Sequence, residues 1–448
     1  MILFSPIGTT DPLRDFFDGG MLHIVRHYKG KGLWKVVLFY TKSMAEIEHD
    51  YHPYTKSIKK VAPEMKIEEI FTDITQPQLY DTFIDIFPKI IYELHEKYPY
   101  EKILLNLSSG TPQMKSLLAL ISMENTYTIP VQVNSPRKAA NRNLPQISDE
   151  EDFLIMFWDM ADDVPDAPNR CLEPPLRVIR KYSDKSKIIS LCLRYDYDAA
   201  LTIAEKNEDI PIIVKKLLNH AAYRRKLQLK DACKILETYN GEELSPFKEE
   251  SQKKLMEYYL TIDIDQKTSN LFSVLLKSTP FIYELLLGLV FRDTELNVEK
   301  CCTYQGTKKF LLKRELLAEK NPSLLNFLDK LYKPGFRDSQ LASINLTNIC
   351  EFASVNATDE DKRNLYKNIY DILKLLNKSD VSLLRNDLAH IITDVDEGKF
   401  QRITGLVSSK QLVDYFFKLL LLVYGEEVRH QRGFYDRFNK WLKLELEK

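Results

Sequence analysis

Three side chains near the end of the chain are of the types that cleave RNA. Arg385 and Asn386 are adjacent, and His390 follows four residues after Asn386 on a predicted helix. Residues four apart share a helix face, and the long Arg385 side chain can reach back to that face. A histidine can move a proton from a ribose 2′-OH or to a leaving 5′-oxygen, and a guanidinium can stabilise the charge that develops on the phosphate. The spacing is therefore suited to phosphodiester cleavage that needs no metal ion.

The same spacing also arises by chance. The chain has eight histidines, and about one pairing of an arginine with a histidine at this distance is expected at random. Taken alone, His390 would be interpreted as a partly buried structural histidine. Its catalytic interpretation depends on the helical setting around it and on two loops far upstream.

These two loops have the composition of a phosphate-binding edge. Each follows a predicted strand, and ligands of open α/β sheets bind beyond the carboxyl ends of the strands. The N–H groups of the helical turn that begins near Gln113 can meet phosphate oxygens, assisted by nearby hydroxyl groups. The loops contribute Gly8, Thr9, Thr10 and Asp11 from the first, and Ser108, Ser109, Gly110 and Thr111, followed by Gln113 and Lys115, from the second.

An alternative for the second loop is a simple N-capping turn, because serine and threonine are favoured at helix starts. Neither loop has the spacing of a P-loop or of G-x-G-x-x-G, which disfavours ATP hydrolysis and dinucleotide redox chemistry. Two such loops at two predicted strand ends favour a ligand site. Lys115 and Arg14 could add positive charge there, although a solvated surface role is the preferred interpretation for either residue alone.

The elements that must position these loops have the pattern of a parallel sheet. Short β-branched or aromatic runs at residues 2–7, 34–40, 66–71, 102–106 and 129–134 alternate with amphipathic segments such as 78–96 and 113–125. Such alternation is typical of βα units. The first part of the chain is therefore predicted to be Rossmann-like α/β.

The second part is predicted to be all-α. Residues 149–166 are acidic and are followed by several prolines, as in an interdomain connection. Beyond residue 176 nearly every periodic segment has the 3.6-residue period of a helix. We predict a ligand-sensing domain over 1–165, a helical connecting region over 166–265 and a catalytic helical bundle over 266–448.

Composition excludes several classes of protein. The 448 residues are 44% hydrophobic and 28% charged, with a net charge of -1, so no global positive field would attract nucleic acid and any such contact must be local. Apolar stretches at 281–291 and 415–424 are too short to span a bilayer and are predicted to be buried helices. The six cysteines show no C-x-x-C spacing, and the start resembles no secretion signal, so we expect reduced thiols and a cytoplasmic protein.

Two further features have structural and functional interpretations. His23 and His27 are four apart, a spacing compatible with a metal, but no third ligand is evident and we expect no metal site. Basic and aromatic residues between Arg429 and Lys443 could form an RNA-binding face. An amphipathic terminal helix with a solvated basic side is the preferred interpretation of that segment.

Together these motifs resemble the ancillary ribonucleases of type III-A CRISPR systems, in which an N-terminal CARF domain precedes a C-terminal HEPN domain. Residues 8–12 and Asn106 to Lys115 look like the two CARF ligand motifs, and Arg385 to His390 looks like the HEPN R-x4-H signature. The resemblance covers the whole chain in architecture. Ser108 and Ser109 stand where many relatives carry Thr-Gly or Gly-Gly, which bears on the fine ligand preference.

The resemblance implies a homodimer whose CARF domains bind a cyclic oligoadenylate, with a six-membered ring favoured by the branch that the chain resembles. Binding would activate single-stranded RNA cleavage by Arg385, Asn386 and His390 without a metal or other cofactor, leaving a 2′,3′-cyclic phosphate. We expect no membrane contact and no stable association with the CRISPR effector complex. Threonines of the CARF loops could also let the protein slowly cleave its own ligand.

Two other functions remain open at this point. A nucleotide-sensing regulator without catalysis would use the same loops but would have no need for Asn386 and His390 on one helix face. A nucleotide hydrolase built on the Rossmann-like part would lack a phosphate-loop lysine and acidic metal ligands.

Overall fold

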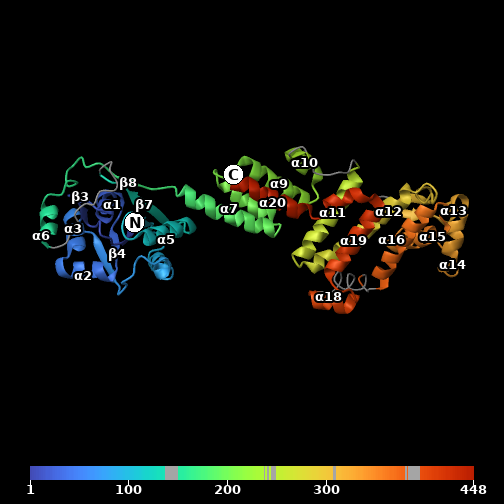
Figure 1. Cartoon of the computed structure of the whole chain (residues 1–448), viewed down its shortest axis with the longest axis horizontal. Helices are drawn as coiled ribbons and strands as arrows, with labels where there is room; N and C mark the ends of the chain where they lie inside the picture. The colour runs from blue at the N-terminus through green and yellow to red at the C-terminus, as the bar shows by residue number, and fades with distance from the viewer. Residues whose placement is uncertain are drawn as a thin grey trace. The chain divides into compact units, whose positions relative to one another are not determined.

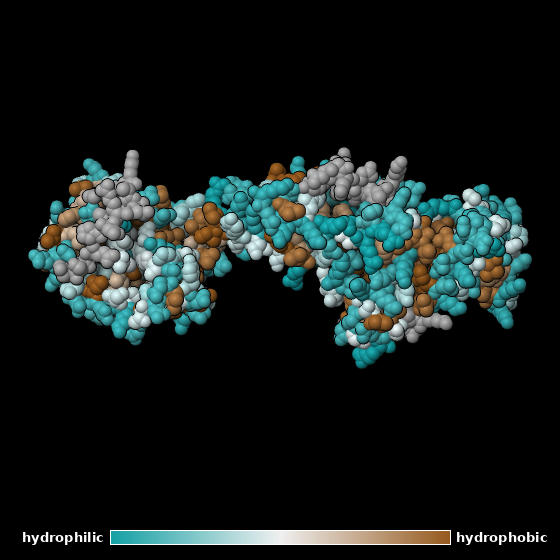
Figure 2. Space-filling model, viewed as in Figure 1, coloured by the Kyte–Doolittle hydropathy of each residue, from teal (hydrophilic) through white to brown (hydrophobic). Residues whose placement is uncertain are grey.

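The computed structural model describes residues 1–136, 150–236, 238–239, 242–243, 249–305, 309–378, 381 and 394–448 (Figure 1). The chain forms two compact units, Met1–Tyr182 and Ser183–Lys448, called here the N-terminal and C-terminal units. On the face shown in Figure 2 both are covered mainly by hydrophilic residues, with scattered apolar patches. The three-domain division with boundaries at residues 165 and 265 stays a prediction.

The N-terminal unit is built on a six-stranded sheet in which five strands are parallel and the last is antiparallel. The five parallel strands confirm the five predicted from sequence to within a residue at most ends. β1 lies between β4 and β6, so the strand order reverses beside it. The strands, in spatial order, are β5 (Lys66–Phe71), β4 (Lys35–Tyr40), β1 (Ile2–Pro6), β6 (Ile103–Asn106), β7 (Thr128–Val133) and β8 (Cys171–Leu172).

Helices cover both faces of this sheet, because alternate residues of its buried strands point to opposite sides. Phe4 and Phe39 pack against Phe87 of α4 on one face, with ring centroids 5.3 and 5.1 Å apart. Leu3 and Val36 belong to the core on the other face. The first face is covered by α4 (Ile86–Lys97) and α5 (Pro112–Glu124), and the second by α1 (Gly20–Tyr28), α3 (Pro53–Val61) and α6 (Glu150–Trp158).

Shorter elements complete the unit. Two-residue strands β2 and β3 form a hairpin after the first loop, and its positive φ angles at Asp15 and Phe16 mark the tight turn between them. Strands this short carry too few residues for a period to show in the sequence. These elements are β2 (Leu13–Arg14), β3 (Phe17–Asp18), α2 (Lys42–Tyr51) and the 3₁₀ turn η2 (Tyr80–Phe83).

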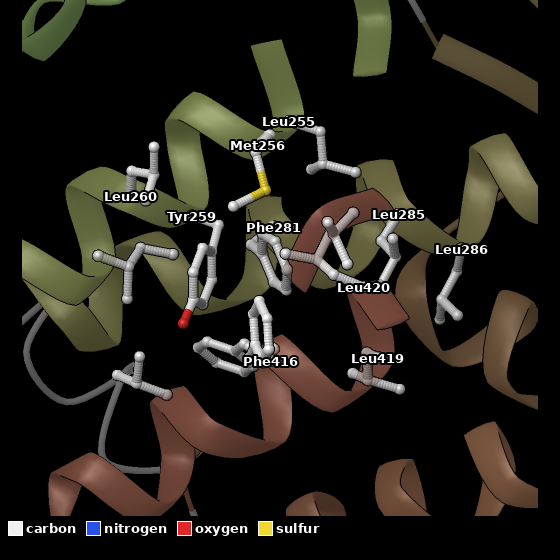
Figure 3. Close-up of a cluster of buried hydrophobic side chains, with 14 of the residues drawn as sticks. Leu255, Met256, Tyr259, Leu260, Phe281, Leu285, Leu286, Phe416, Leu419 and Leu420 are labelled. Carbon is white, nitrogen blue, oxygen red and sulfur yellow. The ribbon is translucent and has the colours of Figure 1, made fainter. Parts of the chain in front are cut away.

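The C-terminal unit is mostly helical, as predicted. Figure 3 shows part of its core, where Tyr259, Phe281 and Phe416 point toward one another from three helices. The helices are α8 (Tyr197–Lys206), α9 (Ile212–Arg225), α10 (Leu229–Ile235), α11 (Glu250–Lys267), α12 (Leu271–Arg292), α13 (Arg314–Lys320), α14 (Pro322–Leu331), α15 (Ser343–Asn356), α16 (Glu360–Lys378), α18 (Glu397–Thr404), α19 (Ser409–Tyr424) and α20 (Phe434–Glu447), preceded by α7 (Arg177–Leu193), which begins in the N-terminal unit.

Strands also occur in this unit, although its sequence carries almost no strand signal. An antiparallel three-stranded sheet follows α12, and a two-residue ladder follows α10. The strands have only two to four residues each, which is too short to reveal a two-residue period. They are β9 (Thr238–Tyr239), β10 (Glu242–Glu243), β11 (Cys302–Gln305), β12 (Lys309–Leu312) and β13 (Ser339–Gln340).

Helix α12 is long and apolar enough to cross a membrane by length and composition alone. Its contacts are those of a core helix, because Phe281, Leu285 and Leu286 are fully buried among α11, α15 and α19. The amphipathic nature predicted for the terminal segment is also observed, since Phe438 and Leu442 of α20 are buried whereas Lys440 and Lys443 are exposed.

Candidate functional site

The two predicted loops meet at one edge of the sheet. They follow β1 and β6, which are neighbours, at the point where the strand order reverses. A Cβ atom added to Gly8 would lie only 2.6 Å from the backbone nitrogen of Gly110, and Gly110 itself has a φ of +81°. Glycine is therefore needed at both positions, by close approach at one and by backbone conformation at the other.

Asp11 joins the loops through its buried carboxylate. Its Oδ1 accepts hydrogen bonds from the Met21 backbone N–H at 3.0 Å and from the Ser109 hydroxyl at 2.9 Å, and its Oδ2 accepts one from the Gly8 N–H at 3.1 Å. The residue is only 4% exposed. Asp11 was predicted as a ligand residue, and in this structure its carboxylate holds the first loop, the second loop and the start of α1 together.

Asn106 organises the second loop from inside; it opens the second ligand motif but was not predicted to contact the ligand itself. Its Nδ2 donates to the hydroxyls of Ser5 at 2.9 Å and Ser109 at 2.8 Å, and its Oδ1 accepts from the Ser108 N–H at 2.8 Å. The Ser108 hydroxyl in turn accepts from the Val133 N–H of β7 at 2.6 Å. The signal for this role is an amide at the buried end of an otherwise apolar strand, where a polar side chain needs partners.

Thr111 begins α5 and connects the site to a third segment. Its side chain accepts from the Met114 N–H at 3.4 Å as an N-cap, and it donates to the Pro77 carbonyl at 2.9 Å. The segment that contains Pro77 leaves β5 and passes the start of α2, where the Lys42 N–H donates to the Ile74 carbonyl. Residues 72–79 therefore run along the carboxyl edge of the sheet from β5 toward α5.

This crossing segment ends in exposed apolar side chains that sequence inspection missed. Leu79 is 51% and Tyr80 is 68% exposed, three residues or fewer from the carbonyl that bonds Thr111. Such exposure is common on this protein, but these two side chains are adjacent and lie beside the polar edge, where a flat base could contact them. The available signal was the Gln76-Pro77 pair after a strand, which predicts a turn but not its direction.

The groups that remain accessible at this edge differ from those that build it. Thr9 is exposed, and Thr10, Gln113 and Lys115 are half-buried. Lys115 forms no salt bridge with any described residue, and the buried Oε1 of Gln113 has no hydrogen-bond partner there. The polar groups of Thr9, Thr10 and Lys115 can thus still meet an incoming anion, whereas the buried Oε1 of Gln113 is an acceptor and would need a donor instead.

Burial controls the charges of the site. It raises the pKa of Asp11, although the hydrogen bonds from Met21 and Ser109 partly offset the effect. Burial likewise lowers the pKa of Lys115, partly offset by attraction to Asp11. A phosphate oxygen placed beside Lys115 would favour its charged form and would be stabilised in return.

His23 lies in a cluster of charged side chains that bears on the metal expectation. Single ligand atoms of Asp18, His23 and Asp162 lie within 4.8 Å of one another. Arg26 bonds both carboxylate oxygens of Asp18, and Arg170 donates to Asp162 at 2.6 Å. Because these arginines already neutralise the carboxylates, the cluster fits an ion-pair network that anchors the segment around residue 162 to α1 rather than a cation site.

The predicted catalytic residues Arg385, Asn386 and His390 lie outside the described residues. The described elements on either side of them are α16 and α18. Helix α16 packs against α15 and α19, and Tyr366 and Ile369 in its middle are buried. The segment is therefore flanked by a helix that belongs to the core of the C-terminal unit.

Comparison with protein families assigns both parts of the chain to known domain types. Residues 66–171 match the Cas_Csm6 CARF domain, residues 174–225 match the CRISPR-associated protein Csm6 6H domain, and residues 244–443 match the Cas_Csm6 HEPN domain. A Rossmann-like sensor sheet followed by a helical HEPN region defines a CARF–HEPN protein.

Individual relatives give the same result. The CRISPR system endoribonuclease Csm6 of Mycobacterium tuberculosis is 37% identical over 233 residues, or 51% of this chain and 54% of that protein. The CRISPR system endoribonuclease Csm6′ of Streptococcus thermophilus is 30% identical over 292 residues, or 63% of this chain and 71% of that protein. The chain belongs to the Csm6 family.

A solved structure extends the likeness in fold to the full chain. Enterococcus italicus Csm6 bound to cyclic hexa-2′-fluoro-hexa-dAMP matches 99% of both chains with a TM-score of 0.65 and 22% sequence identity. The predicted fold class, a Rossmann-like sheet followed by a helical HEPN region, is thereby confirmed.

Replacing Asp11 tests whether its carboxylate holds the loops. We expect Asp11→Ala to lower the free energy of unfolding of the N-terminal unit by about 1–3 kcal/mol, because three donors lose a buried acceptor while removal of the buried carboxylate offsets part of that loss. Asp11→Asn keeps one acceptor oxygen and should lose less. Urea denaturation followed by tryptophan fluorescence measures the effect, since Trp34 and Trp158 both lie in this unit. An unchanged midpoint for Asp11→Ala would contradict the role.

The stability should also depend on pH in a defined direction. A pKa raised in the folded state means that folded Asp11 binds a proton more readily than unfolded Asp11. The stability of the wild type relative to Asp11→Asn should therefore increase as the pH falls through the folded pKa, and level off below the ordinary value of 3.8. Unfolding of both proteins across this range measures the difference, and the opposite slope would show that the hydrogen bonds outweigh burial.

Proposed function

We propose that this protein is an endoribonuclease that cuts single-stranded RNA without a metal and is activated by a cyclic oligoadenylate. The observation that carries the proposal is the edge at the strand-order reversal, where Lys115 and the hydroxyls of Thr9 and Thr10 remain accessible in a chain of the Csm6 family. Phosphates of a nucleotide ligand suit such an edge, because the first turn of α5 offers the Gln113 N–H beside the lysine, whereas the Met114 and Lys115 N–H groups already bond Thr111.

Ligand symmetry supports a homodimer. A ring of identical nucleotides has rotational symmetry, so a C2 dimer can present one copy of the edge to each half of the ring. The same symmetry would bring two copies of His390 to one composite site, with one histidine acting as base and the other as acid. Arg385 would stabilise the phosphate charge, and Asn386 would share the helix face. The expected product carries a 2′,3′-cyclic phosphate.

A six-membered ring is the proposed activator. The likeness in fold to Enterococcus italicus Csm6, whose solved structure is bound to cyclic hexa-2′-fluoro-hexa-dAMP, supports this ring size. The two sites belong to different domains, so activation is a coupling free energy set by how differently the ring binds the active and inactive states. The protein would act in the cytoplasm, away from membranes and from stable association with the CRISPR effector complex.

Slow cleavage of the bound ring is a further part of the proposal. It needs an accessible hydroxyl near a ribose 2′-OH held for in-line attack. The Thr111 hydroxyl already bonds Met114 and Pro77, whereas Thr9 and Thr10 remain available. This favours the first loop as the site of that reaction.

The catalytic assignment is tested by Arg385→Ala and His390→Ala. We expect each to lower the rate of RNA cleavage by at least about 100-fold, as removal of an acid–base or charge-stabilising group does. The assay follows a fluorophore–quencher single-stranded RNA in EDTA, with no ligand, with cyclic tetra-adenylate and with cyclic hexa-adenylate.

Binding of cyclic hexa-adenylate, measured by calorimetry, should survive in both variants. Full activity in either variant would remove the residue from the catalytic set. If the wild type cleaves no RNA with any of the ligands, the protein is better described as a regulator that senses nucleotides without catalysis.

The accessible side of the ligand edge is tested by Lys115→Ala and Tyr80→Ala. Loss of a charged hydrogen bond to phosphate costs about 1.5–3 kcal/mol, so Lys115→Ala should weaken cyclic hexa-adenylate binding by about 10- to 100-fold. Tyr80→Ala should weaken it by about 5- to 100-fold if the exposed ring stacks on an adenine, a contact worth about 1–3 kcal/mol per base.

Tyr100→Ala is the matched control, because Tyr100 is fully exposed just before β6, at the opposite edge of the sheet. Calorimetric titration of each variant with the ring gives the dissociation constants. Equal affinity of the Tyr80 and Tyr100 variants would remove residues 72–80 from the ligand site.

A further inference from the structure

Two adjoining pockets in the C-terminal unit share the side chain of Tyr195. One has a volume of about 180 Å³ and an apolar wall that includes Leu193 and Leu442. The other has a volume of about 370 Å³ and lies between the start of α8 and the end of α9. We call the two pockets together the Tyr195 groove, and the cations that line it are Arg194, Arg225, Lys226, Lys277, Lys440 and Lys443.

The carboxylates that line the groove already have partners. Asp196 caps α8 by accepting from the Ala199 N–H at 3.2 Å. Asp198 pairs with Lys226 at 2.7 Å. Asp436 accepts from the Tyr195 hydroxyl and pairs with Lys267 at 2.7 Å, and although burial opposes the effect, these bonds lower its pKa.

The cations that line the groove outnumber the carboxylates that line it. Arg225 and Lys277 share one buried carboxylate, that of Asp265, at 3.6 and 2.5 Å. Lys443 pairs with Glu447 at 3.7 Å. Arg194 and Lys440 are exposed and form no direct salt bridge with any described residue, although Lys440 is close enough to Asp436 to help lower the pKa of that carboxylate. In a chain of net charge -1, the groove is therefore a local excess of positive charge on both sides of Tyr195.

Tyr195 occupies a backbone conformation that tyrosine rarely adopts. It has a φ of +58° and ends α7 with the bonds of a Schellman motif, from the Tyr195 N–H to the Cys192 carbonyl at 2.9 Å and from the Asp196 N–H to the Leu191 carbonyl at 3.0 Å. Glycine is the residue that suits this position. A bulky residue in the left-handed region signals strain and is a reason to seek a role for its side chain.

We propose that the Tyr195 groove binds a single-stranded RNA, with phosphates on the cations and a base against Tyr195 and the adjacent apolar wall. Basic grooves that track the backbone, combined with aromatic side chains that stack bases, are how proteins hold single strands without sequence preference. Leu193, which is 67% exposed, extends the apolar surface for a base. The site rests on the proposed function, since it would hold the strand that the enzyme cuts.

The test compares two variants of equal charge change in a His390→Ala background, so that RNA is not cut during measurement. Arg194→Gln with Lys440→Gln removes one cation from each pocket. Lys320→Gln with Lys330→Gln is the control, because both lysines are exposed on α13 and α14 and do not line the groove. Fluorescence anisotropy of a labelled single-stranded RNA of about 20 nucleotides, longer than the site of one typical single-strand-binding fold, gives Kd in EDTA at several salt concentrations.

The groove variant should bind at least about tenfold more weakly than the His390→Ala parent at low salt. Its slope of log Kd against log salt should fall by about 1.4, since each phosphate contact contributes about 0.7 on a single strand. The Lys320→Gln, Lys330→Gln control should have the same Kd and the same salt slope as the His390→Ala parent. Equal weakening of both variants, or an unchanged slope in the groove variant, would overturn the proposal.

Substitution of Tyr195 separates its ring from its hydroxyl. Tyr195→Phe should bind RNA within about twofold of the parent, whereas Tyr195→Gly, which relieves the backbone strain, should bind several-fold more weakly while remaining folded by circular dichroism. Parent-like binding by Tyr195→Gly would remove the ring from the site. The ribonuclease proposal fails separately, by absence of cleavage in the wild-type chain with any ring, because binding is measured without catalysis.

Discussion

The buried carboxylate of Asp11 is the interaction on which the ligand edge depends. Three donors from three segments converge on it: the Gly8 N–H, the Met21 N–H and the Ser109 hydroxyl. Leaving such donors without an acceptor costs about 1–3 kcal/mol each, so the loops cannot separate without a large loss. Burying the charge is itself unfavourable, as its raised pKa shows. The loop geometry is thus maintained by three hydrogen bonds that offset only part of the desolvation of one carboxylate.

The loop residues fall into two groups, those that hold the loops in place and those that remain accessible to a ligand. Asn106 and Ser109 are buried and bond other parts of the protein, whereas Thr9 and Lys115 keep polar groups that reach the edge. Preorganisation of this kind lowers the entropic cost of binding, because the loops do not have to order when a ligand arrives. The crossing segment that bonds Thr111 through Pro77 adds a third wall to the same edge. Substitutions at buried and accessible positions should therefore affect binding for different physical reasons.

Sequence alone predicted the parallel sheet and both loops, because strand periods and strand-end glycines are local signals. The sequence could not show that Asp11 holds the loops whereas Lys115 remains accessible. Burial of the Asp11 carboxylate depends on Met21 and Ser109, which lie 10 and 98 residues away. The two-residue strands escaped detection because they carry no period. The role of Tyr195 was not predicted, because neither its φ nor its contact with Asp436, 241 residues away, can be inferred from the residues next to it in the sequence.

Both anion sites proposed for this chain arise by the same means. Its net charge of -1 provides no general attraction for nucleotides, so positive potential must come from local arrangement. At the ligand edge Asp11 is buried and fully bonded, which leaves Lys115 as the accessible charge. In the Tyr195 groove the carboxylates cap a helix or pair with neighbouring cations. Arg194 and Lys440 are left without a direct salt bridge to any described residue, and Lys440 feels only the longer-range attraction of Asp436. A nearly neutral chain can therefore hold two nucleotide-binding surfaces, because the partners of each carboxylate decide which cations remain available.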